Sequence, residues 1–174
     1  DTFETLDNRT RTSTEYLVAG LDWLADAGVT VINASVAGPA NRILQRVVER
    51  LEGLGIPLVA AAGNGGPRAD PAYPAAYPST LAVTAVNEQL FPYRDANRGE
   101  YLSLAAPGVD VWVPDGEGGR RQRGTSFAAP FVTGAMAMAR SQMPGAAPGI
   151  LREQLTTRAR DLGPAGKDPL YGWG

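Results

Sequence analysis

The chain has 174 residues, of which 44% are hydrophobic and 20% charged, proportions that suit one globular domain with a buried core. The net charge of −2 and the scattered basic residues give no reason to expect nucleic acid, and no apolar run approaches the ~20 residues that span a bilayer. The chain has no cysteine and no histidine, which excludes disulfides, thiolate metal sites, a cysteine nucleophile and the usual neutral-pH base.

The sequence of the N-terminal part of the chain predicts a loop, a helix and a strand. Residues 1–13 are polar and predict a loop, after which Ser13 or Thr14 caps a helix that Gly28 ends. Residues 29–35 (VTVINAS) scarcely alternate in polarity, which predicts a short strand buried on both faces.

The next part repeats this order. A second helix begins at Pro39 and stops at Gly55, and residues 56–62 (IPLVAAA) predict a second buried strand. The alternation of strand and helix implies a parallel sheet with right-handed crossovers. The apolar stripe expected on the second helix consists of Ile43, Val47 and Leu51.

The remaining elements complete one α/β domain, whose ligands are expected at the carboxyl ends of its strands. Glycine and proline predict an irregular segment at 63–78 and a flexible loop at 116–124. Residues 125–142 have helical length and are apolar nearly all round, which predicts a central buried helix. Further strands are expected at 81–86, 101–106 and 109–113, and a last helix at about 147–158.

Three segments lie where such a sheet would place a site. Ser126 begins the buried helix, where free backbone N–H groups can stabilise an oxyanion, although a serine there is more often only a cap. Asn64 follows a buried strand and offers two amide donors, although Asn-Gly is also a common turn. The segment 35–38 presents backbone groups for an added strand, or it is an ordinary loop.

Taken together and in this order, the segments resemble the subtilisin-like serine peptidases (subtilases). GTSFAAP (124–130) is similar to the nucleophile motif of that family, AAAGN (60–64) to its oxyanion-hole motif, and VINASVAGP (31–39) to the strand and loop of its substrate cleft. YPAAYPSTLAVTAVN, LAAPGVDV and the final YGWG also resemble family segments. The resemblance implies a three-layer α/β fold, a mostly parallel sheet with helices on both faces, here incomplete because N-terminal strands and helices are absent.

The resemblance also implies a role for each matching residue. Ser126 would be the nucleophile, and Asn64 would donate a side-chain hydrogen to the oxyanion together with the Ser126 N–H. Tyr73–Pro74 would be a cis peptide. The substrate main chain would pair with Ser35, Val36, Ala37 and Gly38, and the pocket for the residue before the cut would be lined by Ala61, Ala62 and Gly63.

The family's Asp and His motifs have no match. Asp1-Thr2-Phe3 lacks the required glycine, and Lys167, the only lysine, lies in a Gly/Pro/Asp loop typical of a solvated charge. We therefore expect residues 1–174 to be the C-terminal part of one catalytic domain, inactive as a peptidase alone. The alternatives are a non-catalytic module that binds extended peptides and a small-molecule-binding domain; the latter is disfavoured because GNGGP lacks the spacing G-x-G-x-x-G.

Partners and cofactors follow from the same interpretation. A polypeptide substrate is expected, together with the missing N-terminal half of the domain or a second copy of the chain covering the exposed sheet edge. Arg120, Arg121 and Arg123 precede the nucleophile and would favour acidic leaving-side residues, or they belong to a solvated loop. The residues identify no cofactor. Calcium around the carbonyls of Ala75 and Tyr77, and a secreted or cell-envelope location, rest on family resemblance alone.

Overall fold

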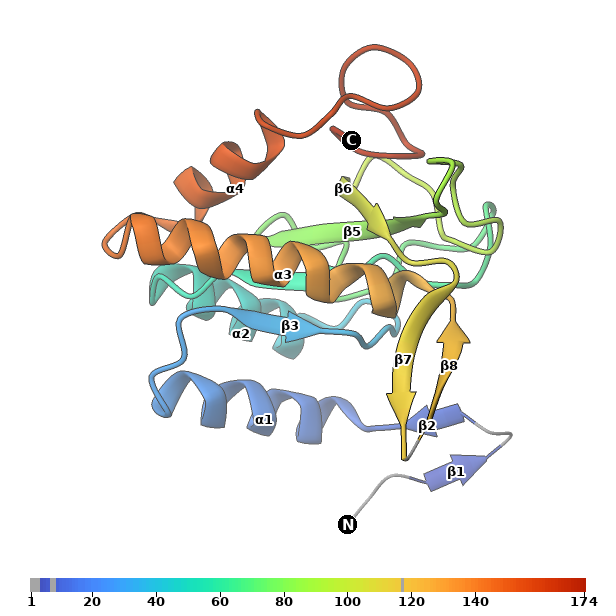
Figure 1. Ribbon diagram of the computed structural model, residues 1–174. Coiled ribbons are helices and arrows are strands. Elements are labelled where there is room, and N and C mark those ends of the chain that lie inside the picture. The colour runs from blue at the N-terminus through green and yellow to red at the C-terminus, as the bar shows by residue number, and fades with distance from the viewer. Residues whose placement is uncertain (1–3, 7–8, 117) are drawn as a thin grey trace.

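The computed structural model describes residues 4–6, 9–116 and 118–174 (Figure 1). Four strands form a parallel sheet in the order β3-β4-β5-β6, and two further pairs, β1-β2 and β7-β8, are antiparallel. In the described part of the chain, no helix has the length and apolarity needed to cross a membrane. The elements are β1 (Glu4–Leu6), β2 (Arg9–Arg11), α1 (Thr14–Asp26), β3 (Ile32–Ala34), α2 (Arg42–Gly53), β4 (Leu58–Ala61), β5 (Thr80–Val86), β6 (Leu102–Pro107), β7 (Val111–Asp115), β8 (Gly118–Gln122), α3 (Thr125–Gln142) and α4 (Pro148–Thr156).

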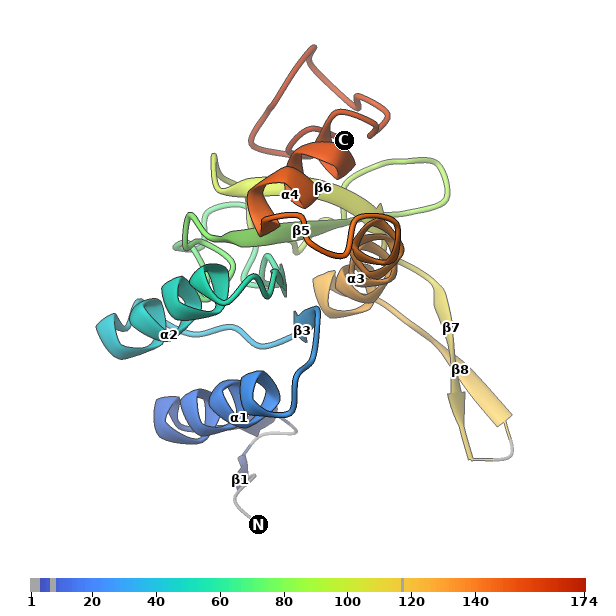
Figure 2. The same ribbon diagram turned by 90° about the vertical axis from the view of Figure 1, so that its left-hand side faces the viewer.

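The predicted α/β fold with helices on both faces of the sheet is confirmed. In Figure 2, α1 and α2 lie on one side of the sheet, and α3 and α4 lie on the other. Strand β4 is buried on both faces because alternate residues point to opposite layers. Leu58 and Ala60 pack in the cluster of α1 and α2, whereas Val59 and Ala61 pack in the cluster of α3 and α4.

The two outer strands of the sheet differ in how they are covered. The C-terminal segment runs along β6, where the Ala105 N–H bonds the Gly174 carbonyl and the Trp173 N–H bonds the Ser103 carbonyl. Among the described residues no strand pairs with the outer edge of β3. Strand β3 therefore presents the open edge of this sheet.

The apolar stripe of α2 is displaced from the predicted one. Ile43 is 64% exposed, whereas Leu44, Val48 and Leu51 are buried. The pairs Ile43-Leu44 and Val47-Val48 allow two stripes about 100° apart on the helix, and packing against the sheet selects the second. The helix also begins after Asn41, whose Oδ1 accepts from the N–H groups of Ile43 and Leu44.

Two segments predicted as loops contain strands. Residues 1–13 were expected to be loop, but Glu4–Leu6 pairs with Arg9–Arg11; Asp1-Thr2-Phe3 lies outside the described residues. Residues 116–124 were expected to be flexible, but Gly118–Gln122 pairs with β7. Glycine normally weakens a strand, yet here the Trp112 ring packs over Gly119, where a Cβ would lie 2.3 Å from the ring and displace it.

Helix α3 has the predicted bounds but is not buried all round. Ala128, Ala129 and Met136 face the sheet and are inaccessible to solvent. On the other face, Phe131 is 52% and Met138 63% exposed. The sequence pattern is that of a helix covered on all sides, and the described elements cover only one side.

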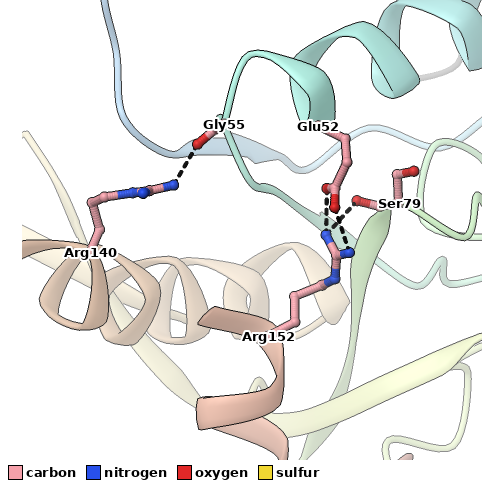
Figure 3. Close-up of polar contacts among 5 residues, drawn as sticks. All are labelled: Glu52, Gly55, Ser79, Arg140 and Arg152. Atoms are coloured by element: carbon pink, nitrogen blue, oxygen red, sulfur yellow. Dashed lines mark hydrogen bonds and ion pairs between the residues drawn. The ribbon is translucent and has the colours of Figure 1, made fainter. Parts of the chain in front are cut away.

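Two arginines join the helical layers at the amino ends of β4 and β5 (Figure 3). Arg140 of α3 is 9% exposed and donates to the carbonyls of Gly55, Pro144 and Ala146. Arg152 of α4 holds both carboxylate oxygens of Glu52 at 2.6 and 2.8 Å and also donates to the Ser79 carbonyl. These contacts fix α3 against the loop that follows α2, and α4 against the last turn of α2 and the residue before β5.

Replacing Arg140 with methionine is expected to lower the free energy of unfolding by about 2–4 kcal/mol, because three carbonyls lose a charged donor in a largely buried place. The midpoint of urea unfolding at constant slope measures this change. Arg46→Met, on the exposed face of α2, is the matched control and should change stability by less than about 0.5 kcal/mol. Equal losses in the two variants would contradict a buried anchoring role for Arg140.

Candidate active site

The carboxyl ends of β3 and β4 meet the first turn of α3. Ala34 pairs with Ala60 in parallel register. Residues 35–38 and 61–64 therefore lie at the same end of the sheet, where the strands terminate. Helix α3 begins at that end (Figure 1), which places Ser126 between the two segments. The structure thus brings together Ser126, Asn64 and the expected cleft segment.

The first turn of α3 is capped by Asn64, which lies 61 positions earlier in the chain. Gly124 is the N-cap residue and makes no side-chain cap bond. Instead, Oδ1 of Asn64 accepts from the Thr125 N–H at 2.9 Å and from the Thr125 hydroxyl at 3.1 Å. The alternative that Ser126 is only an N-cap is therefore wrong, because the capping oxygen comes from a distant strand end.

This cap also orients the other end of the Asn64 amide. Because Oδ1 serves two donors, Nδ2 points away from Thr125, and it lies 3.3 Å from where a Cβ of Gly124 would stand. Among the described residues no acceptor is recorded for Nδ2 of Asn64 or for the Ser126 N–H, which belongs to the first helical turn. Two hydrogen-bond donors therefore remain available beside Ser126.

Thr125 connects the end of β4 to the helix, a role that the sequence pattern did not reveal. Its hydroxyl accepts from the Gly63 N–H at 3.2 Å while donating to Asn64, and the residue is completely buried. A signal did exist, since a threonine with no exposed surface needs hydrogen-bond partners. The sequence could not identify those partners.

A proline creates a second contact at the nucleophile. Pro130 has no N–H, so the carbonyl of Ser126, four residues earlier, lacks its helical partner. The Ser35 hydroxyl donates to that carbonyl at 3.1 Å. Behind it, Asn33 donates to the Ser35 oxygen and accepts from Thr133 of α3. The cleft segment is thereby attached to the nucleophile helix.

The segment 35–38 is open along only part of its length. The N–H and C=O of Gly38 both bond Tyr73 at 2.9 Å, and the Tyr73–Pro74 peptide is cis, as predicted. For the main chain of Ser35, Val36 and Ala37, no partner is recorded within the described residues. An added peptide strand can therefore pair with these three residues, whereas Gly38 is already engaged.

The segment 61–63 is held from behind. Ala61 and Ala62 are buried, and the Tyr101 hydroxyl donates to the Ala62 carbonyl at 2.7 Å. Burial raises the pKa of Tyr101, so its hydroxyl stays protonated and able to donate at neutral pH. The Gly63 carbonyl accepts from the Asn97 N–H, and a Cβ at Gly63 would lie 2.8 Å from the Asn97 side chain. Gly63 must therefore remain glycine.

In the described site, no hydrogen bond is recorded for the Ser126 hydroxyl. Two hydrogen-bond donors lie beside it, but no base does. The 174 residues include no histidine, and Lys167 donates to the Glu100 carbonyl in the C-terminal loop rather than reaching Ser126. The serine hydroxyl is a weak nucleophile without a paired base. The described geometry therefore places a serine hydroxyl beside two hydrogen-bond donors, with no histidine or lysine next to it.

Thr125→Val is expected to slow acylation of Ser126 about tenfold and to destabilise the fold by about 1–3 kcal/mol. The isosteric change removes the hydroxyl that orients the Asn64 amide and leaves the buried Gly63 N–H without an acceptor. Labelling kinetics in an active form of the protein, with urea unfolding in parallel, measure both effects. Thr125→Ser keeps the hydroxyl and should retain most of the rate; a loss equal to that of the valine variant would contradict the hydroxyl's role.

Comparison with known proteins places this chain in a family. The sequence model of the Subtilase family matches residues 3–174. Subtilisin amylosacchariticus from Bacillus subtilis subsp. amylosacchariticus is 36% identical over 154 residues, covering 85% of this chain and 40% of that protein. Subtilisin from Bacillus pumilus is 36% identical over 154 residues and is covered to 56%. The structure of fervidolysin from Fervidobacterium pennivorans superposes with a TM-score of 0.81 at 29% identity, over 92% of this chain and 27% of that one.

These matches agree with the site and with the fold. The chain spans 40% to 56% of the length of these two subtilisins. The family match extends over nearly the whole chain, and the superposition covers 92% of it. The chain belongs to the Subtilase family of serine peptidases.

Proposed function

We propose that this chain carries the nucleophile, the oxyanion hole and part of the substrate cleft of a serine endopeptidase. The observation that carries the proposal is the Asn64 amide, whose Oδ1 is fixed by Thr125 so that Nδ2 and the Ser126 N–H are both free beside the serine. Attack by the Ser126 Oγ on a peptide carbonyl forms a tetrahedral oxyanion that accepts from these two donors. Loss of the amine then leaves an acyl-enzyme, which water hydrolyses.

The proposal includes a base that this sequence does not contain. A histidine outside these 174 residues takes the proton from Ser126 and returns it to the leaving amine. The chain by itself is then inactive as a peptidase. The chain matches only part of each of the two subtilisins, which is consistent with a base supplied by residues outside it.

The open edge of β3 is the place where we propose that the rest of the site joins. A groove of about 410 Å³ lies between α1 and β3, and it is lined by Leu17, Leu21 and Trp23 among other residues. Trp23 is 69% exposed there. A strand added at this edge would bury apolar surface and would end near Ser35, beside the nucleophile. A second copy of the chain is the competing occupant.

A fluorophosphonate probe, which reacts with an activated serine, tests the proposal. Labelling of Ser126 in a longer protein that contains this chain and a histidine supports it. A longer protein that folds, binds extended peptides and fails to react would instead be a non-catalytic peptide-binding module.

A further inference from the structure

The β7-β8 hairpin stands beside the nucleophile and makes few contacts with the rest of the fold. It projects from the sheet in both views (Figures 1 and 2). Its second strand ends at Gln122, directly before Arg123, Gly124 and the helix that carries Ser126. The Gly124 N–H bonds the Gly108 carbonyl, which fixes the base of the hairpin at the site. Side chains at this base lie close to any peptide held on Ser126.

The charges of the hairpin are divided between its two faces. Successive strand residues point to opposite faces, so Arg120 and Arg121 of β8 lie on different faces, and Arg123 stands directly after the end of the strand. Arg120 is paired with Asp115 at 3.3 Å. Arg121 instead donates to the Asp110 main-chain carbonyl at 2.7 Å, a contact that positions its guanidinium without neutralising it.

The uncompensated charge gathers at the base of the hairpin. The Arg121 guanidinium reaches the carbonyl of Asp110, the residue directly before β7, and Arg123 is the residue directly after β8, so both arginines lie at the base of the hairpin. Among the described residues no ion pair is recorded for Arg121, Arg123 or the Asp110 carboxylate. Arg94 and Asp95, which also lie near Tyr93 and Arg123, pair with each other at 3.3 Å, so the two arginines against Asp110 leave this end of the hairpin with a net positive charge.

The hairpin lies on the leaving-group side of Ser126. In Figure 2, α2 and the hairpin lie on opposite sides of α3, and residues 35–38 lead into α2. A peptide whose acyl part pairs with residues 35–37 therefore continues past Ser126 toward the hairpin. Resting on the proposed function, we propose that Arg121 and Arg123 are specificity-determining residues that favour substrates with Asp or Glu directly after the scissile bond.

The test compares internally quenched peptides that share one acyl side and differ after the cut. In the active longer protein, kcat/KM should be about fivefold higher for Asp-Glu than for Ala-Ala at this position, and lower for Lys-Lys. Arg121→Gln with Arg123→Gln should remove the preference. Arg120→Gln, whose charge is already paired, should keep it. Salt at 1 M should also abolish the preference, because the Debye length falls to about 3 Å.

A binding experiment tests the role of Arg121 and Arg123 independently of the proposed peptidase activity. Fluorescein-labelled leaving-side peptides are titrated by anisotropy into the 174-residue chain, which needs no base. Tighter binding of the acidic peptide than of the alanine peptide, lost in the double variant and kept in Arg120→Gln, supports the proposal even where no peptide is cleaved. Cleavage at equal rates for acidic and neutral peptides, or acid preference unchanged in the double variant, overturns it while the proposed function stands.

Discussion

A fluorophosphonate probe is expected to label Ser126 in a longer protein that contains this chain and a histidine base, and to leave the 174-residue chain essentially unlabelled. The chain supplies the oxyanion donors, but its serine has no base to remove the proton. We expect labelling of the isolated chain to be slower by on the order of 10⁴-fold. Mass spectrometry of the labelled peptide identifies the modified residue, and the time course gives the rate.

Two variants make the result specific to Ser126. Ser126→Ala in the longer protein should abolish both labelling and peptide hydrolysis. Ser141→Ala changes an exposed serine at the other end of α3, whose hydroxyl only donates to the Met138 carbonyl, and should leave both unchanged. Equal labelling of the isolated chain and the longer protein would mean that a residue within this sequence serves as the base.

Asn64→Ala in the active longer protein is expected to lower kcat by about 10²–10³-fold with little change in KM. This range is the loss of kcat that follows removal of one oxyanion-hole donor in subtilisin. The reason is that Nδ2 of Asn64 would donate only to the developing oxyanion. The same change removes the oxygen that caps α3, so stability should also fall by about 1 kcal/mol.

Asn64→Asp separates these two roles of the amide. A carboxylate keeps the oxygen that accepts from Thr125 and suits a helix N-terminus, so thermal stability should be preserved or slightly raised. The side chain has lost its donor and carries a negative charge toward the oxyanion, so kcat should fall at least as far as in Asn64→Ala. Activity retained in the aspartate variant would show that Asn64 acts only as a cap.

Elements whose sequence signals are local could be predicted well. Helix α3 begins and ends where expected because Gly124 precedes it and a Met-Pro-Gly sequence follows it. Strand β8 could not be predicted, since its glycines resemble a loop until the Trp112 ring is seen to lie over Gly119. The buried side of α2 was likewise ambiguous, because two adjacent apolar stripes fit the same sequence.

The candidate site shows the same division. The nucleophile motif and the asparagine after a buried strand indicated Ser126 and Asn64, since short motifs carry their chemistry in their residue types. No pattern in the sequence indicated that Asn64 caps the helix of Ser126, or that the Ser35 hydroxyl donates to the carbonyl that Pro130 leaves without a helical partner. The first contact joins residues that are 61 positions apart in the sequence, and the second joins residues that are 91 positions apart.

The sequence by itself determined the α/β alternation, the family and the absence of a histidine base from these 174 residues. These properties depend on residue types and on spacing along the chain. Only the tertiary structure decided the direction of the Asn64 amide, the engaged state of Gly38, the uncovered face of α3 and the side of the nucleophile on which the charged hairpin stands. Each of these depends on which distant segments are packed together, and hydrogen-bond direction and burial exist only once that packing is formed.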